Sequence, residues 1–215
     1  MEEKKYAIFD FDGVLADTER YYDVFWDEMG ERYETGIPHF AGVIKGTTLP
    51  HILAKYFADR TEETRQRIAQ ESNKFDHEDI PFPPIPGSLE FVRELKANRI
   101  PVALATSSDD IKMERAFREM GIVGLFDAIV TADMIEHGKP APDCYLLAAK
   151  KLGAKPSACL VFEDSFAGIE AAKAAGMRVV ALATTNEAGK LKKKTERVIP
   201  NLEGKTVRDF QAWFE

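Results

Sequence analysis

Cysteine is scarce in this chain of 215 residues: only Cys144 and Cys159 occur, and they form no CxxC pair. A framework of several disulfides, as in small secreted domains, is therefore excluded, and we expect two reduced, buried thiols. The four histidines show no metal-ligand spacing such as HxxxH. We therefore expect no zinc site.

Positive charge and long apolar runs are also limited. The 29 Lys and Arg residues stand against 36 Asp and Glu residues, which gives a net charge of -7. A protein that binds nucleic-acid phosphates normally presents an excess of cations. The charged opening MEEKKYAIFD leads into an apolar run far shorter than a signal peptide or a membrane helix. We therefore expect a cytoplasmic protein with no nucleic-acid partner and no membrane partner.

The chain does contain five short, continuous apolar runs, rich in Val, Ile, Leu and Ala. They are Tyr6 to Phe9, Val102 to Ala105, Ala128 to Val130, Cys159 to Phe162 and Val179 to Leu182. Runs that are apolar throughout are typical of strands buried on both faces of a parallel sheet. Helical stretches separate them, one of which we expect to be capped by Ser108 and to stop at Gly121. The pattern predicts an α/β fold with a doubly wound, mainly parallel sheet.

Residues 19–83 break the alternation of strands and helices. YYDVFWDEM and LPHILAKYF space their aromatic and aliphatic residues as helices do, and we find no convincing strand in this segment. The proline-rich run from Ile80 to Gly87 predicts a stiff connection, either a hinge or a rigid surface loop. We therefore predict a helical cap domain at 19–83, inserted after the first strand of an α/β core formed by 1–18 and 84–215.

Polar residues follow four of the expected strands, at the end where open α/β sheets bind ligands. In strand order, they are Asp10 and Asp12, then Thr106, Ser107 and Ser108, then Lys139, and finally Glu163 and Asp164. Each set has an ordinary alternative, since acidic pairs form turns, hydroxyl residues cap helices and a single lysine is usually solvated. Together they supply what phosphoryl transfer requires: a nucleophile, an acid/base, charge neutralisation and metal ligands.

The segments FDFDGVLADTE, LATSS, GKPAPD and VFEDSFAG resemble, in order and spacing, the four motifs of the haloacid dehalogenase (HAD) superfamily. The resemblance covers Tyr6 to Thr18 and Pro84 to about Thr185, and the most similar branch contains β-phosphoglucomutase and sugar-phosphate phosphatases. It implies a Mg²⁺-dependent phosphatase, a phosphoric monoester hydrolase, that acts on a small phosphorylated metabolite such as a sugar phosphate.

The resemblance also implies catalytic roles. Asp10 would attack the phosphorus and form an aspartyl-phosphate, and Asp12 would protonate the leaving alkoxide and then deprotonate water. Thr106 and Ser107 would bind the phosphoryl oxygens, and Lys139 would bind them while offsetting their charge in the transition state.

A metal site follows from the same resemblance. Mg²⁺ would be bound by Asp10, by the main-chain carbonyl of Asp12 and by Asp164, with Glu163 either a direct ligand or a neighbour of the ligands. Asp143 would orient the motif lysine or cap its own helix.

The cap would contact the substrate and influence the choice of reaction. Its loop KGTTL, Lys45 to Leu49, implies substrate contacts from Lys45, Gly46 and Thr47, but it lacks the arginine of the mutase loop that it resembles. Tyr22 stands where the mutase has a histidine. Both departures favour a phosphatase, with a phosphomutase as the alternative and a non-catalytic phospho-ligand-binding protein as a third interpretation. For a chain of this size that carries a cap, we expect a monomer.

Overall fold

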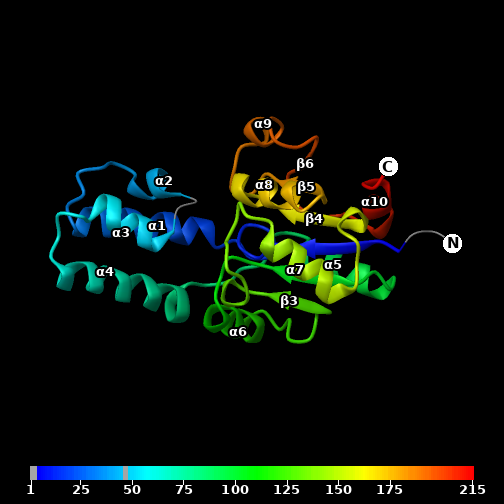
Figure 1. The fold of residues 1–215 in the computed structure, drawn as a ribbon, viewed down its shortest axis with the longest axis horizontal. Coiled ribbons are helices and arrows are strands. Elements are labelled where there is room, and N and C mark those ends of the chain that lie inside the picture. Colours follow the sequence, from blue (N-terminus) through cyan, green and yellow to red (C-terminus); the bar gives the residue numbers. More distant parts are fainter. Residues whose placement is uncertain (1–3, 46–47) are drawn as a thin grey trace. The chain divides into compact units, whose positions relative to one another are not determined.

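The computed structural model describes residues 4–45 and 48–215, and Figure 1 shows its fold. The chain divides into two compact units. One comprises the residues up to Asp17 together with Phe82–Glu215, and the other comprises Thr18–Pro81. We call the first the core unit and the second the insert unit. Each unit buries its own set of apolar side chains.

The described residues of the core unit form one sheet of six parallel strands in the order β3-β2-β1-β4-β5-β6. The strands are β1 Tyr6–Phe9, β2 Val102–Ala105, β3 Ala128–Val130, β4 Cys159–Glu163, β5 Arg178–Leu182 and β6 Arg197–Ile199. Strands β1 to β5 lie where the apolar runs predict them, and the predicted α/β fold is confirmed. The sequence does not predict β6, because this edge strand has three half-buried residues and no continuous apolar run.

Helices cover the sheet. In the core unit they are α5 Ser88–Ala97, α6 Asp110–Glu119, α7 Asp143–Leu152, α8 Phe166–Ala174, α9 Ala188–Leu191 and α10 Val207–Ala212, with 3₁₀ turns at Ala132–Met134 and Pro156–Ala158. Helix α7 packs against β1, β2 and β3, and α8 packs against β4 and β5. The cap expected at Ser108 is wrong by one residue. Asp109 is the N-cap of α6, because its side chain accepts a hydrogen bond from the main chain of Lys112.

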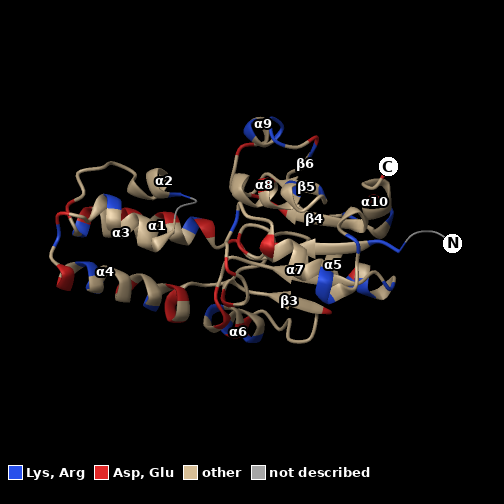
Figure 2. Cartoon of the chain, viewed as in Figure 1, with Lys and Arg blue, Asp and Glu red and all other residues tan. Residues whose placement is uncertain are grey.

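Strands β1, β2 and β4 are buried along their whole length, and Figure 2 shows the strands of the sheet almost free of charged residues. One face packs against α7 and α8, which contribute several alanines together with Tyr145 and Ile169. Successive side chains of a strand point to opposite faces of the sheet. Phe9 of β1 and Phe162 of β4 stack with ring centroids 4.5 Å apart, and Phe91 of α5 contacts both rings edge-on. Strand β1 lies between β2 and β4, so the residues after these three strands share one edge of the sheet.

The insert unit is helical, as predicted for the segment after the first strand. Its helices are α1 Glu19–Arg32, α2 Phe40–Ile44, α3 Leu49–Tyr56 and α4 Glu62–Lys74, followed by a π-helical turn at Phe75–Asp79. Aromatic and aliphatic side chains at helical spacing form its centre, among them Trp26, Met29, Phe40, Phe57 and Ile68. Across the residues that the structure describes in both units, no helix has the length and apolar character needed to cross a membrane.

Candidate active site

Main-chain hydrogen bonds hold the predicted site residues at the ends of neighbouring strands. The N–H of Asp10 donates to the carbonyl of Phe162 over 3.1 Å, and the N–H of Thr106 donates to the carbonyl of Val130 over 3.0 Å. Asp10 and Thr106 are both buried. Ser107 is exposed. The ladder of parallel strands therefore fixes where the first two motifs lie before any side-chain contact is considered.

Lys139 lies between two carboxylates. Its Nζ atom is 2.9 Å from Oδ1 of Asp10 and 2.8 Å from Oε1 of Glu163, and the three side chains are 5%, 11% and 0% exposed, respectively. Buried charges of this kind persist only when they are paired. Lys139 comes from the segment before α7, so the pairing joins three of the predicted motifs in one cluster.

Burial and ion pairing compete to set the pKa values of these groups, and the outcome differs between the two carboxylates. Burial raises the pKa of Asp10 to about 8, although the charge of Lys139 acts against this rise. Burial would lower the pKa of Lys139, but the charges of Asp10 and Glu163 outweigh it and raise that pKa. Burial would likewise raise the pKa of Glu163, but Lys139 outweighs it and lowers that pKa. One lysine is thus shared by two carboxylates, and Glu163 has further hydrogen-bond donors, Ser165 and Tyr145, that also lower its pKa.

Glu163 has a crowded set of hydrogen-bond donors. Besides Lys139, Tyr145 Oη donates to Oε1 over 2.9 Å. Oε2 accepts from the N–H groups of Asp164 and Ser165, both over 2.8 Å, and from Ser165 Oγ over 2.9 Å. A carboxylate offers about four acceptor positions, so these five donors saturate Glu163. Its contacts orient Lys139 and fix the turn between β4 and α8.

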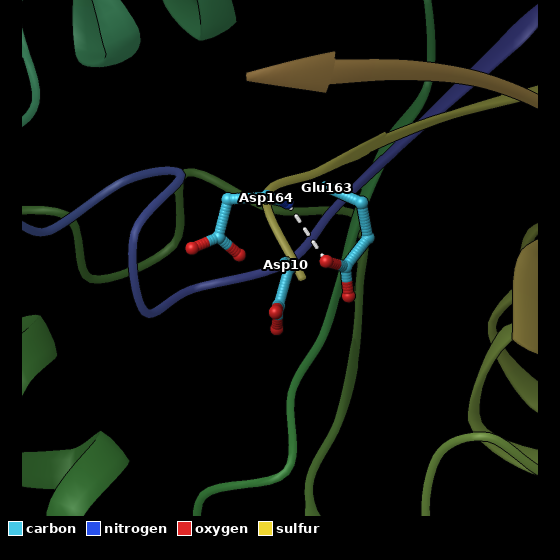
Figure 3. A group of neighbouring side chains, drawn as sticks. All are labelled: Asp10, Glu163 and Asp164. Atoms are coloured by element: carbon cyan, nitrogen blue, oxygen red, sulfur yellow. Dashed lines mark hydrogen bonds between the residues drawn. The ribbon is translucent and has the colours of Figure 1, made fainter. Parts of the chain in front are cut away.

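Three carboxylates approach one another at this end of the sheet. Figure 3 shows Asp10 together with Glu163 and Asp164, and ligand oxygens of the three residues all lie within 4.8 Å of one another. An all-oxygen set of this kind suits a hard divalent cation. The cluster can hold a metal ion.

The loop after β5 supports the same cluster, and sequence reasoning missed it. Thr184 Oγ1 donates to the carbonyl of Gly13 over 2.5 Å, and Asn186 Nδ2 donates to the carbonyl of Asp164 over 3.0 Å. Thr185 Oγ1 is buried and has no hydrogen-bond partner among the residues described. The signal was available, because Thr184, Thr185 and Asn186 follow the fifth apolar run just as the motif residues follow the others.

Gly13 packs directly against this loop and against Asp164. Its φ of +72° is in the left-handed region, which glycine adopts without strain. A Cβ atom at this position would overlap Oδ2 of Asp164 and would lie 2.6 Å from Oγ1 of Thr185. The absence of a side chain at Gly13 therefore lets the acidic cluster and the Thr185 hydroxyl come together.

Asp12 is held by two residues that sequence reasoning did not assign to it. Ser108 Oγ donates to Oδ2 of Asp12 over 2.8 Å, and Lys112 Nζ lies 2.7 Å from Oδ1. Elsewhere in the core unit, Asp143 lies in the first turn of α7, and its Oδ2 atom is 3.1 Å from Nδ1 of His137. The lysine expected beside Asp143, Lys139, pairs with Asp10 and Glu163 instead.

The insert unit contains the cap residues predicted to contact the substrate, Lys45, Gly46 and Thr47. Lys45 Nζ lies 3.0 Å from Oδ1 of Asp23 and 3.1 Å from Oε2 of Glu19, so two carboxylates of α1 neutralise its charge. Gly46 and Thr47 lie outside the described residues.

Curated relatives resemble the chain over most of its length. It is 36% identical over 180 residues to the phosphorylated carbohydrates phosphatase of Thermotoga maritima, which covers 80% of this chain and 81% of that protein. It is 34% identical over 196 residues to a fructose-1-phosphate phosphatase of Escherichia coli, which covers 82% and 96%, respectively. The chloroplastic protein SUPPRESSOR OF QUENCHING 1 of Arabidopsis thaliana is 38% identical over 194 residues, 83% of this chain but only 18% of that longer protein.

Solved structures share the whole fold. A HAD hydrolase of family IA, variant 3, from Entamoeba histolytica has a TM-score of 0.81 at 28% identity, covering 98% of this chain and 99% of that one. A β-phosphoglucomutase from Clostridium difficile has a TM-score of 0.78 at 27% identity, covering 99% and 97%.

The family profile described as haloacid dehalogenase-like hydrolase matches residues 4–176, a span that contains all four predicted motifs. The relatives named as phosphatases agree with the predicted enzyme class, a phosphoric monoester hydrolase, and that prediction is confirmed. The chain therefore belongs to the haloacid dehalogenase-like hydrolase family.

Proposed function

We propose that this protein is a Mg²⁺-dependent phosphatase that hydrolyses a small phosphorylated metabolite through an aspartyl-phosphate on Asp10. The substrate class that we propose is the sugar phosphates. The observation that carries the proposal is the buried cluster in which Lys139 pairs with Asp10 beside Asp164. The names of the Thermotoga and Escherichia relatives support phosphorylated carbohydrates as the substrate class.

The residues present fit a divalent cation. Three buried carboxylates lie together, and Lys139 pairs with two of them, Asp10 and Glu163. Thr185 Oγ1, a buried polar atom without a partner among the described residues, lies beside Oδ2 of Asp164. Asp10, Asp164 and the carbonyl of Asp12 would hold Mg²⁺, whereas the five donors on Glu163 favour a role outside the ligand set. When bound, Mg²⁺ would supply positive charge beside the phosphoryl group.

Each residue then has a task in the two chemical steps. A carboxylate oxygen of Asp10 attacks the phosphorus as the bond to the leaving oxygen breaks, and Asp12 gives a proton to that oxygen. Asp12 then removes a proton from the water that attacks the aspartyl-phosphate, which releases inorganic phosphate and restores Asp10. Lys139 and the Thr106 segment hold the phosphoryl oxygens.

The insert unit acts in this proposal as the cap that supplies substrate contacts, and water is the preferred acceptor. The pairing of Lys45 with Glu19 and Asp23 supports hydrolysis, because a mutase must grip a second phosphate and this lysine is already neutralised. The similarity to a β-phosphoglucomutase keeps a phosphomutase as the second candidate. The roles of Lys45, Gly46 and Thr47, a monomeric state and a cytoplasmic location, with neither nucleic-acid nor membrane partners, stay predictions.

The test is phosphate release from an aryl phosphate in the presence of Mg²⁺. The wild type should turn over, Asp10→Asn should lose activity by more than about 10³-fold because its nucleophile is gone, and EDTA should stop the wild type. Asp127→Asn is the matched control, since Asp127 pairs with Lys96 outside the cluster. Equal release by wild type and Asp10→Asn would refute the nucleophile, and turnover in EDTA would refute the metal.

A second assay separates the two candidate reactions. The protein is given β-glucose 1-phosphate with a trace of the corresponding bisphosphate, and the products are followed by NMR. Free glucose supports the phosphatase. Glucose 6-phosphate in its place would establish the mutase.

A further inference from the structure

Lys112 occupies a position that is unfavourable for a lysine in two ways. It is the third residue of α6, and its N–H bonds to the N-cap Asp109 over 2.9 Å. A cation in the first turn opposes the helix dipole. Its side chain is also only 4% exposed, and lysine is almost never so deeply buried unless it is paired. Residues that break local rules in this way are found mainly at functional sites.

The partner of Lys112 is Asp12. Lys112 Nζ lies 2.7 Å from Oδ1, and Ser108 Oγ donates to Oδ2 over 2.8 Å. Ser108 lies just before the N-cap of α6 and Lys112 lies in its first turn, and the two donors bind different oxygens of one carboxylate. A single contact would leave the carboxyl group free to rotate, whereas two contacts fix its plane.

We propose that Lys112 is a positioning residue for Asp12, which it holds as the base that takes a proton from the attacking water. This inference rests on the proposed function, because it assigns Lys112 to the step in which water cleaves the aspartyl-phosphate. The sequence gives no sign of this role, since 100 residues separate Asp12 from Lys112.

An aryl phosphate allows hydrolysis of the aspartyl-phosphate to be measured separately from its formation. An aryl leaving group departs as a stable anion and needs no proton from Asp12, so kcat/KM for an aryl phosphate reports on attack by Asp10 alone. Hydrolysis of the aspartyl-phosphate still needs Asp12 to take a proton from water, and this step then limits kcat.

The experiment compares wild type, Lys112→Met and Asp12→Asn with 4-nitrophenyl phosphate and Mg²⁺. General acid–base catalysis contributes about 10²–10⁴-fold, so loss of positioning should lower kcat by about 10–100-fold. The value of kcat/KM should stay within about threefold, and a burst of nitrophenol should appear before the slow steady state. In an Asp12→Asn background, Lys112→Met should change kcat less than about twofold, because Lys112 acts through Asp12.

Two further variants control for folding and for charge. Lys96→Met removes a lysine that pairs with Asp127 over 2.5 Å in the same unit, and it should leave kcat unchanged. Ser108→Ala removes the other anchor of Asp12, and it should lower kcat selectively even if Lys112→Met does not fold.

The outcomes are distinct. The proposal is overturned by an unchanged kcat in a folded Lys112→Met protein, by an equal loss in kcat and kcat/KM, or by effects of Lys112→Met and Asp12→Asn that multiply. A wild type that releases no phosphate at all would instead refute the proposed function.

Discussion

Replacing Gly168 by alanine should destabilise the protein, although alanine is the better helix former. Gly168 lies in the first turn of α8, where the change alone should stabilise the folded protein by at most about 0.5–1 kcal/mol. However, a Cβ atom at Gly168 would overlap the Glu163 carboxylate at Oε1. Glu163 is fully buried and binds Lys139, so moving it leaves a buried charge without its partner, which costs about 3–5 kcal/mol. The net loss should be about 2–4 kcal/mol.

Urea denaturation and calorimetry measure this loss, and the melting temperature should fall by roughly 5–15 °C. The matched control is Gly189→Ala in α9, where an added Cβ meets nothing within 4 Å. That variant should be as stable as the wild type or slightly more so. If Gly168→Ala behaves like Gly189→Ala, Glu163 does not occupy the position described, and its role in orienting Lys139 is refuted.

Two other replacements test the loop after β5 and the last helix. Thr185→Val removes a buried hydroxyl without a partner among the described residues, so the metal-free protein should be at least as stable as the wild type. Its Mg²⁺ affinity, measured by calorimetric titration, should fall by about 10–100-fold, and unchanged affinity would exclude Thr185 from the metal site. Asp209→Ala should reduce the free energy of unfolding by about 1 kcal/mol at pH 7. Hydrogen bonds from the main chain and side chain of Thr206 lower the pKa of Asp209, so its contribution is present above about pH 4 and lost as the pH falls through the lowered pKa. A difference from wild type that persists at low pH would contradict this linkage.

The residues that sequence alone could place are those whose position depends on one local pattern. Apolar runs locate β1 to β5, and the residue after a buried parallel strand must lie at the carboxyl edge of the sheet. Asp10, Thr106 and Glu163 are therefore predictable at one edge of the sheet, and the structure adds the strand order and brings Lys139 to two of them.

The residues that sequence could not place depend on contacts between distant segments. The bond from Thr184 to Gly13 joins positions 171 apart, and Lys112 meets Asp12 across 100 residues. Which side of a helix faces a strand end is decided by packing, and a lysine in the first turn of α6 looks like a surface residue until that packing is known. Similarly, the need for glycine at position 168 becomes visible only when the Glu163 side chain is seen to pack against it.

The central claim, that Asp10 is the nucleophile, is tested most directly by trapping the phosphorylated enzyme. The protein is quenched during turnover of an aryl phosphate, the acyl phosphate is reduced with borohydride, and the product is located by peptide mass spectrometry. Reduction of an aspartyl-phosphate yields homoserine, which we predict at position 10 of the wild type and of Lys112→Met, with the higher yield in the latter. Steady phosphate release with no modified residue, or with the modification at any other position, would contradict the account.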